Sequence, residues 1–145
     1  MTKRRIILLV IVIICIIIGI VLYFLKFNQN MQNNKDIYYK EENGVKINTS
    51  SKLKEEKVFD NIKVTEINYT NASGITQFTA NVQNVGEEDF EGKDITIVFL
   101  DDNGNEYAKV EAYIPSLVKG EMNMINCQVV EDKVNAYDFK ILLNN

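Results

Sequence analysis

Histidine is absent from this 145-residue chain, and cysteine occurs only twice. The missing histidine removes the commonest general base and the commonest metal ligand. Two cysteines cannot complete a four-ligand zinc site or build a disulfide-rich scaffold. These absences argue against an enzyme, and the length allows one short folded domain. We therefore expect no catalytic residues, no metal site and no cofactor.

Charged residues are missing from one long segment near the N-terminus. This segment begins at Ile6 and ends at Leu25, and 12 of its 20 residues are Ile or Val. At a rise of 1.5 Å per residue, such a helix spans about 30 Å, the thickness of the hydrocarbon core of a bilayer. The sequence therefore predicts one transmembrane helix over residues 6–25, with the lipid bilayer as its direct partner.

The charges beside this segment predict its orientation. Three basic residues lie within residues 1–5, whereas Lys26 is the only basic residue on the other side before Lys35. The positive-inside rule makes residues 1–5 a cytoplasmic tail and residues 26–145 extracytoplasmic. The apolar run is longer than the core of a cleavable signal peptide and does not end in small residues. We predict an uncleaved single-pass signal-anchor in the cell membrane.

Residues 26–57 differ sharply in composition, because they are rich in Asn, Gln, Lys and Glu. We predict a mostly disordered polar spacer, since such a composition buries little apolar surface. Ile37 and the two tyrosines after it are candidates for local docking. The spacer holds seven Lys and five acidic residues, whereas residues 58–145 hold six Lys and fifteen acidic residues. We expect no nucleic-acid partner for so acidic a domain.

From Val58 onwards, apolar and polar residues alternate with the period of two that is typical of β-strands. A change of parity before Ile67 predicts a β-bulge. Residues 95–100 are apolar on both faces, which predicts a central strand. The apolar positions of the predicted strands include Ile62, Val64, Tyr69, Phe78, Ala80, Val82, Ile97, Phe99, Ala108, Val110, Ala112, Ile114, Ile125, Cys127, Val129, Tyr137, Phe139, Ile141 and Leu143.

Asn103 and Gly104 stand between two alternating runs, which predicts a hairpin with a type I′ turn. About six or seven short antiparallel strands follow one another without a helical pattern. The fold class expected for residues 58–145 is therefore all-β, an immunoglobulin-like β-sandwich preceded by one N-terminal transmembrane helix. The side chains expected in its core are Phe78, Val82, Ile97, Phe99, Val110, Phe139 and Ile141. The single cysteine there excludes a disulfide within the domain.

Short motifs in this region resemble the FxLYD-type domain. They are Asn84-Val85-Gly86, the strand over residues 95–101, Asn103-Gly104 and the turn over residues 117–121. The resemblance covers about residues 62–142 and departs from the family pattern at Leu100 and Lys119. It implies an immunoglobulin-like sandwich of the kind found on membrane-anchored or exported proteins. It implies no chemistry, because the motifs mark turns and strand ends.

Several patterns were candidates for chemistry. Ser116 and Lys119 match the S-x-x-K acylation motif, but they lie in a predicted loop and not at the start of a helix. Cys127 has no histidine to activate it and lies on the apolar side of its strand. Residues 101–106 are half the length of an EF-hand loop, and the acidic run in residues 87–94 leaves a cation site open. Sequons begin at Asn48, Asn68 and Asn71.

The sequence favours a non-catalytic, membrane-anchored binding or structural module of the cell envelope. Its edge strands and loop tips would contact an unidentified envelope or membrane protein. The alternative hypothesis is an accessory or sensory subunit, which joins a larger membrane complex through its transmembrane helix. Gly19 is the only glycine in that helix, so no G-x-x-x-G pairing motif supports the alternative.

Overall fold

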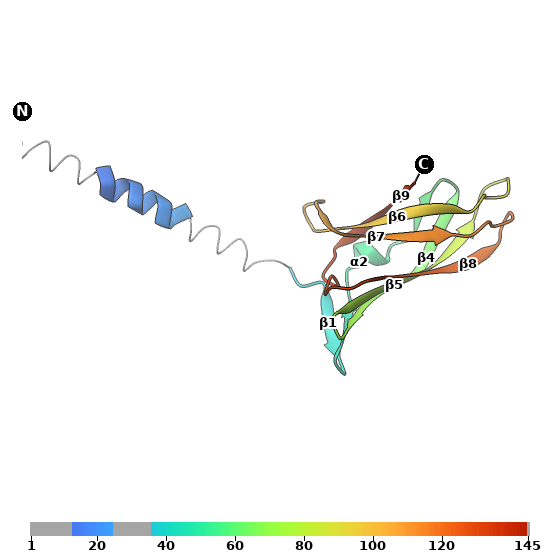
Figure 1. Cartoon of the computed structure of the whole chain (residues 1–145), viewed down its shortest axis with the longest axis horizontal. Helices are drawn as coiled ribbons and strands as arrows, with labels where there is room; N and C mark the ends of the chain where they lie inside the picture. Colours follow the sequence, from blue (N-terminus) through green and yellow to red (C-terminus); the bar gives the residue numbers. More distant parts are fainter. Residues whose placement is uncertain (1–12, 25–35, 145) are drawn as a thin grey trace, which may run out of the picture. The chain divides into compact units, whose positions relative to one another are not determined.

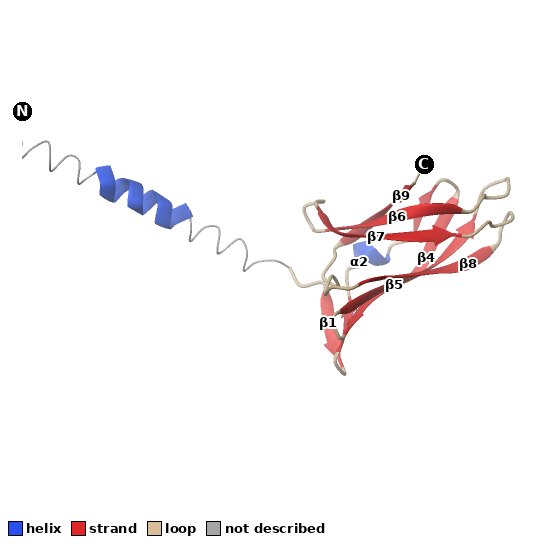
Figure 2. Cartoon of the chain, viewed as in Figure 1, coloured by secondary structure: helices blue, strands red, loops and turns tan. Residues whose placement is uncertain are grey.

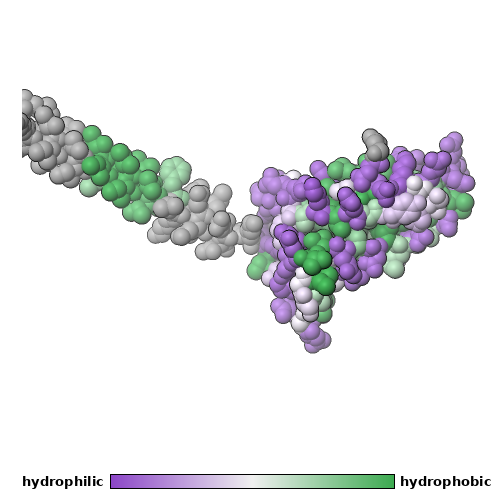
Figure 3. Space-filling model, viewed as in Figure 1, coloured by the Kyte–Doolittle hydropathy of each residue, from purple (hydrophilic) through white to green (hydrophobic). Residues whose placement is uncertain are grey.

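The computed structural model describes residues 13–24 and residues 36–144 (Figure 1). Residues 13–24 are helical, and the visible side of this helix is hydrophobic (Figure 3). No helix within these two ranges is long and apolar enough to span a bilayer. The predicted transmembrane segment, residues 6–25, lies partly outside the described residues. The predicted cytoplasmic tail, residues 1–5, lies wholly outside them.

The chain divides into two compact units, of which the second is Ile37–Asn145. The described part of this unit consists of strands and one short helix (Figure 2). The elements are β1 (Tyr39–Glu42), β2 (Val45–Asn48), α2 (Ser51–Lys54), β3 (Lys57–Phe59), β4 (Ile62–Ala72), β5 (Ile75–Asn84), β6 (Lys93–Leu100), β7 (Glu106–Ile114), β8 (Met122–Val129) and β9 (Asp138–Leu143). The all-β fold class predicted from the alternating pattern is confirmed. Seven of the nine described strands, β3 to β9, lie in the region for which six or seven were predicted, and β1 and β2 lie before it.

The strands form two antiparallel sheets. The larger sheet has the order β1-β2-β4-β5-β8, with β3 also paired to β4, and the smaller has the order β7-β6-β9 (Figure 1). Residues 95–100 belong to β6, which lies between its two neighbours, so the prediction of a central strand is confirmed.

Aromatic side chains from both sheets meet in one core. The ring of Tyr69 on β4 stacks on that of Phe99 on β6, with 4.4 Å between their centroids. Phe78 on β5 lies edge-on to Phe99 at 5.5 Å and to Phe139 on β9 at 5.4 Å. Because the two sheets share these buried side chains, they pack as the two layers of a β-sandwich.

The predicted start of the domain at residue 58 is wrong. Residues 39–48 form the hairpin of β1 and β2, and β2 pairs with β4 from Val45↔Ala72 to Ile47↔Thr70. Leu53 on α2 is fully buried in the core. The disorder predicted for residues 26–57 therefore fails from residue 37 onwards, because contacts with distant strands bury the few apolar side chains present. Residues 26–35 lie outside the described residues.

Three hairpins turn through two residues that both have positive φ. They are Asn43-Gly44, Asp60-Asn61 and Ser73-Gly74. The predicted type I′ turn at Asn103-Gly104 is wrong, because of this pair only Gly104 has positive φ, at 79°. The Asp101 carboxylate accepts hydrogen bonds from the backbone N–H groups of Asn103 and Asn105, and these bonds hold the loop in another conformation.

The β-bulge predicted before Ile67 is confirmed. The pairing of β4 with β5 shifts register between Thr65 and Asn68, and Glu66 has a φ of 51°. The extra residue restores the inward direction of Ile67 and Tyr69, which are both buried.

We expect Gly104→Val to destabilise the protein by about 1–2 kcal/mol, because a β-branched residue resists positive φ. No atom lies within 4 Å of a Cβ placed at Gly104, so backbone strain is the only cost. Urea unfolding measures the change. Gly104→Asn is the matched control, since asparagine tolerates this region of φ, and equal losses for the two variants would contradict the prediction.

Candidate functional site

The loop between β5 and β6 is built around the side chain of Asn84, which is 1% exposed. The Asn84 Nδ2 group donates to the carbonyl oxygens of Glu88 at 2.8 Å and Leu117 at 3.0 Å. The Asn84 Oδ1 atom accepts from the backbone N–H of Gly86 at 2.9 Å. One buried amide thereby joins the acidic loop to the segment before β8.

A second set of contacts fixes the far end of this loop. Phe90 and Leu117 are both buried, and each donates its backbone N–H to the carbonyl of the other, at 2.9 and 3.0 Å. The backbone N–H of Gly92 donates to Ser116 Oγ at 3.0 Å. A Cβ at Gly92 would collide with the Tyr113 hydroxyl, so this exposed side chain would have to shift, and it would lie 3.0 Å from the backbone nitrogen of Ser116.

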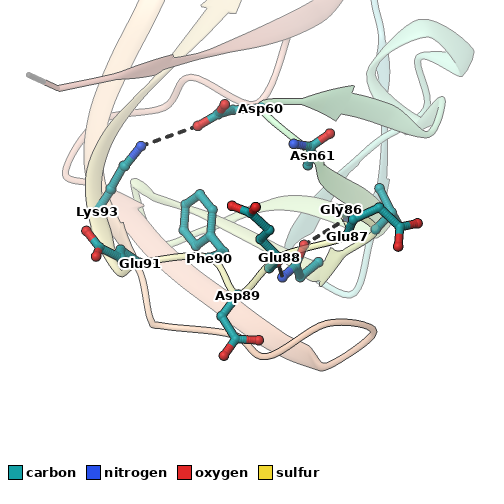
Figure 4. Close-up of a pocket in the computed structure, with 11 residues that line it drawn as sticks. Asp60, Asn61, Gly86, Glu87, Glu88, Asp89, Phe90, Glu91 and Lys93 are labelled. Carbon is teal, nitrogen blue, oxygen red and sulfur yellow. Dashed lines mark hydrogen bonds and ion pairs between the residues drawn. The ribbon is translucent and has the colours of Figure 1, made fainter.

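These contacts shape an open hollow with a volume of about 650 Å³ and an acidic lining (Figure 4). Lys93 forms an ion pair with Asp60 at 3.4 Å, and Lys119 forms another with Glu87. Asp89 accepts a hydrogen bond from the backbone of Lys119. Within the described residues, no three acidic or cysteine side chains are grouped so as to hold a metal ion. Through their contacts with Lys119, Glu87 and Asp89 join the acidic run to the segment before β8.

The structure separates the two residues of the S-x-x-K pattern. Ser116 accepts a hydrogen bond from Gly92, whereas the Lys119 ammonium lies against Glu87. Both residues lie in the loop between β7 and β8, as predicted. The acylation motif needs the lysine beside the serine hydroxyl, and here the two side chains bind different groups.

Asp101, the first acidic residue of the candidate calcium loop, binds the backbone of that loop. Asp101 accepts from the backbone N–H groups of Asn103 at 3.0 Å and Asn105 at 2.8 Å, and Asn105 Nδ2 lies 3.2 Å from its other oxygen. Asp102 accepts from the Asn103 side chain at 2.8 Å. These hydrogen bonds stabilise the β6–β7 loop and need no cation.

Two of the three sequons have asparagines that the fold requires. Asn48 is fully buried, and its Nδ2 group donates to the carbonyls of Val134 at 2.6 Å and Ala136 at 2.8 Å. Asn71 is 5% exposed and donates to Thr76. A glycan on either side chain would displace these contacts, so Asn68 is the only sequon compatible with the folded unit.

A cluster of aromatic and charged residues was missed by the sequence analysis. The Lys46 ammonium lies 5.1 Å from the centroid of the Tyr39 ring and 2.5 Å from the Asp132 carboxylate. Nearby, Lys133 lies 5.5 Å from the centroid of the Tyr107 ring. One sequence pattern could have predicted part of this cluster. An Asn-Gly pair lies between β1 and β2 and is typical of a hairpin turn, although this segment was predicted to be a spacer.

Cys127 is a buried core residue, as predicted from its parity. Its side chain is free of any disulfide and the residue is 8% exposed. Burial disfavours the charged thiolate and raises the pKa of the Cys127 thiol to about 11. A thiol with so high a pKa is a poor nucleophile at neutral pH.

We expect the stability contributed by the neutral Cys127 thiol to be lost as pH rises from about 9 towards 11. In this window the unfolded chain has released a proton that the folded chain still holds, so unfolding becomes more favourable as pH rises. Between pH 8 and pH 10.5, the free energy of unfolding measured with urea should fall by about 1–2 kcal/mol more in the wild type than in Cys127→Ala. Parallel pH profiles for the two proteins would contradict the assignment.

Comparisons with known proteins give one distant likeness. No protein-family model matches the chain, so the resemblance to the FxLYD-type domain has no support from that comparison. No curated protein matches it either. Among solved structures, a DUF1425 family member from Shewanella sp. pv-4 aligns with 68% of this chain and 94% of its own, with a TM-score of 0.39 and 10% identity. This likeness is too distant to assign a family or a function to the chain.

Proposed function

We propose that the protein is a membrane-anchored, extracytoplasmic binding or structural module without catalytic activity. The observation that carries the proposal is a 20-residue uncharged segment, residues 6–25, joined to a separate β-sandwich unit. A bilayer accepts such a segment only as a helix, and residues 13–24 are helical with exposed apolar side chains. The basic residues before it favour an extracytoplasmic position for the sandwich.

The proposed role is binding because the polar groups of the candidate sites serve the fold. Asn84 and Asp101 hold loops, and Lys119 is paired with Glu87. A sandwich whose loops are held by hydrogen bonds and ion pairs presents strand edges and loop tips to a partner. The finer assignment, an immunoglobulin-like domain of the FxLYD type, belongs to this proposal and depends on the motifs around Asn84 and Gly104. The partner we propose is an envelope or membrane protein.

Site-specific labelling of the full chain in cells tests the proposed orientation. Cys15→Ala provides the background, since Cys127 is buried. A membrane-impermeant maleimide should label Glu91→Cys in cells whose outer envelope has been removed, because Glu91 is exposed. The matched variant Thr2→Cys should be labelled only after the cells are permeabilised. The opposite pattern would place the sandwich in the cytoplasm and overturn the proposal.

Exchange of the anchor separates the binding role from the alternative. Residues 1–27 are replaced by an unrelated transmembrane anchor of the same orientation, and proteins crosslinked in native membranes are compared. If the sandwich carries the binding, the same partner is recovered with either anchor. Loss of the partner with the foreign anchor would favour an accessory subunit that is recruited through its helix.

A further inference from the structure

Strand β8 differs from the other edge strands in charge. Among the described strands, β1, β3 and β8 are edges of the larger sheet, and β7 and β9 are edges of the smaller sheet. Charged residues on the other four edge strands are Lys40, Glu41, Glu42, Lys57, Glu106, Lys109, Glu111, Asp138 and Lys140. The eight residues of β8, Met122–Val129, include no charged residue and no proline. Charge and proline are the usual protection of an exposed edge, and β8 has neither.

The edge of β8 is regular over its whole length. It pairs with β5 in eight consecutive positions, from Thr76↔Val129 to Gln83↔Met122, without a register shift. A bulge or a kink would make such an edge unsuitable for another strand. The regular pairing leaves the outer side of β8 straight enough to continue the sheet.

The direction of the outer hydrogen-bonding groups follows from the pairing. The backbone N–H of Asn84 donates to the carbonyl of Glu121 at 3.0 Å, and that of Val85 donates towards β4, to Asn61 at 2.8 Å. In an antiparallel pair the bonded positions alternate, so residues 123, 125, 127 and 129 bond to β5. The N–H and C=O groups of Met122, Met124, Asn126 and Gln128 therefore point away from the sheet.

The side chains along this edge are uncharged and in part apolar. Met122 is 51% exposed and Met124 is 61% exposed. Their partners on β5 are Gln83 and Asn81. The Met124 N–H donates to Asn123 Oδ1 at 2.7 Å, so a local side chain covers one outer donor at the N-terminal end of the edge. The outward N–H and C=O groups of Asn126 and Gln128 lie further along the strand than the Asn123 side chain.

We propose that β8 pairs antiparallel with β8 of a second copy of this chain, so that the two larger sheets form one continuous sheet. Residues 37–145 carry nineteen acidic residues and eleven Lys, so the net charges of two folded units repel each other. Pairing through β8 joins them along the edge that carries no charge. The two copies of Met122 and Met124 then lose exposed apolar area on the outer face.

A two-fold axis makes such an interface self-complementary, because each strand supplies to the other the groups that it receives. A strand from a charged partner would gain nothing from the uncharged side chains at 77, 79, 81 and 83 on the neighbouring strand β5. This inference refines the proposed binding role and rests on it, but it is independent of the orientation of the anchor.

The test removes one outer N–H group without removing a backbone hydrogen bond to β5. The Asn126 side chain accepts a hydrogen bond from Gln77 Nε2 on β5 at 3.0 Å, and both variants below remove the amide oxygen that accepts it, so the comparison between them isolates the N–H group. Asn126→Pro deletes the donor in the middle of the edge, and proline is tolerated where the N–H faces solvent. Asn126→Thr is the matched control, because threonine keeps the N–H and favours strands. The full chain is studied in density-matched non-ionic detergent micelles by sedimentation equilibrium. We expect a concentration-dependent dimer whose dissociation constant rises at least tenfold in Asn126→Pro and changes less than twofold in Asn126→Thr.

Amide hydrogen exchange of the wild-type chain keeps the test decisive if Asn126→Pro fails to fold. The N–H groups of Asn126 and Gln128 should exchange slowly at concentrations where the dimer forms and quickly after dilution, whereas Ile125 stays protected at both. A dimer that Asn126→Pro leaves intact overturns the proposal. A wild-type chain that is monomeric at every concentration also overturns it, and leaves the edge for a strand of another protein. The labelling experiment on the anchor is read independently of either result.

Discussion

A fragment that begins at residue 58 is expected to lose cooperative folding, whereas a fragment that begins at residue 36 is expected to keep it. The segment between these starting points supplies β1, β2 and α2. The shorter fragment loses the pairing of β2 with β4 and the fully buried side chain of Leu53. Burial of one leucine contributes about 1.5–3 kcal/mol, and whole domains are stable by only about 5–15 kcal/mol.

Asn48 adds a long-range connection that the shorter fragment also lacks. Its side chain donates to Val134 and Ala136, and Ser50 Oγ donates to the Tyr137 carbonyl at 2.5 Å. Without them, buried carbonyl groups before β9 have no partner, and each such group costs about 1–3 kcal/mol. The losses together approach the stability of the whole domain.

Circular dichroism during thermal unfolding compares the two fragments. The longer fragment should unfold in one sharp transition, and the shorter one should show a broad transition or none. Asn48→Ala in the longer fragment is the intermediate control, with a single transition at a lower temperature. Equal midpoints for the two fragments would show that residues 37–57 add nothing to the stability of the fold.

Phe99→Ala is expected to reduce the free energy of unfolding by about 3–5 kcal/mol, the range measured for large buried aromatic residues. Phe99 is fully buried between the sheets, where its ring contacts Tyr69 at 4.4 Å and Phe78 at 5.5 Å. The Tyr69 hydroxyl is buried without a hydrogen-bond partner, so the truncated core cannot rely on a polar contact there.

Urea unfolding of the longer fragment measures the effect of Phe99→Ala at pH 7. Leu142→Ala is the matched control, because Leu142 lies on a neighbouring strand of the same sheet but is 47% exposed. The control should cost less than about 1 kcal/mol. Similar losses for the two variants would mean that the aromatic cluster does not support the core.

Local patterning predicted the strands well. In β5 the buried side chains recur at every second residue, since alternate residues of a strand point to opposite faces. In β8 the buried residues Ile125 and Cys127 keep the same spacing. The parity change before Ile67 even located the bulge at Glu66. These features depend on neighbouring residues alone, so the sequence was enough to predict them.

The start of the domain and the turn at Gly104 depend on distant or side-chain contacts, and the sequence predicted them wrongly. Asn48 is buried because it meets carbonyl groups 86 and 88 residues away. No local composition reports such a contact, so the sequence predicts a polar spacer where the structure has β1, β2 and α2. Asn103 lacks positive φ because the carboxylate of Asp101 binds the loop backbone.

The same contrast between local sequence pattern and tertiary contacts applies to strand β8. The sequence by itself determined that residues 125–129 form a strand with Cys127 facing the core, because hydrophobic period alone decides which side chains turn inward. That β8 lies at a sheet edge follows from the strand order, which brings β5 to one side of it and no described strand to the other. Strand order is set by the packing of non-local pairs, and therefore only the tertiary structure decided which edge is open to a partner.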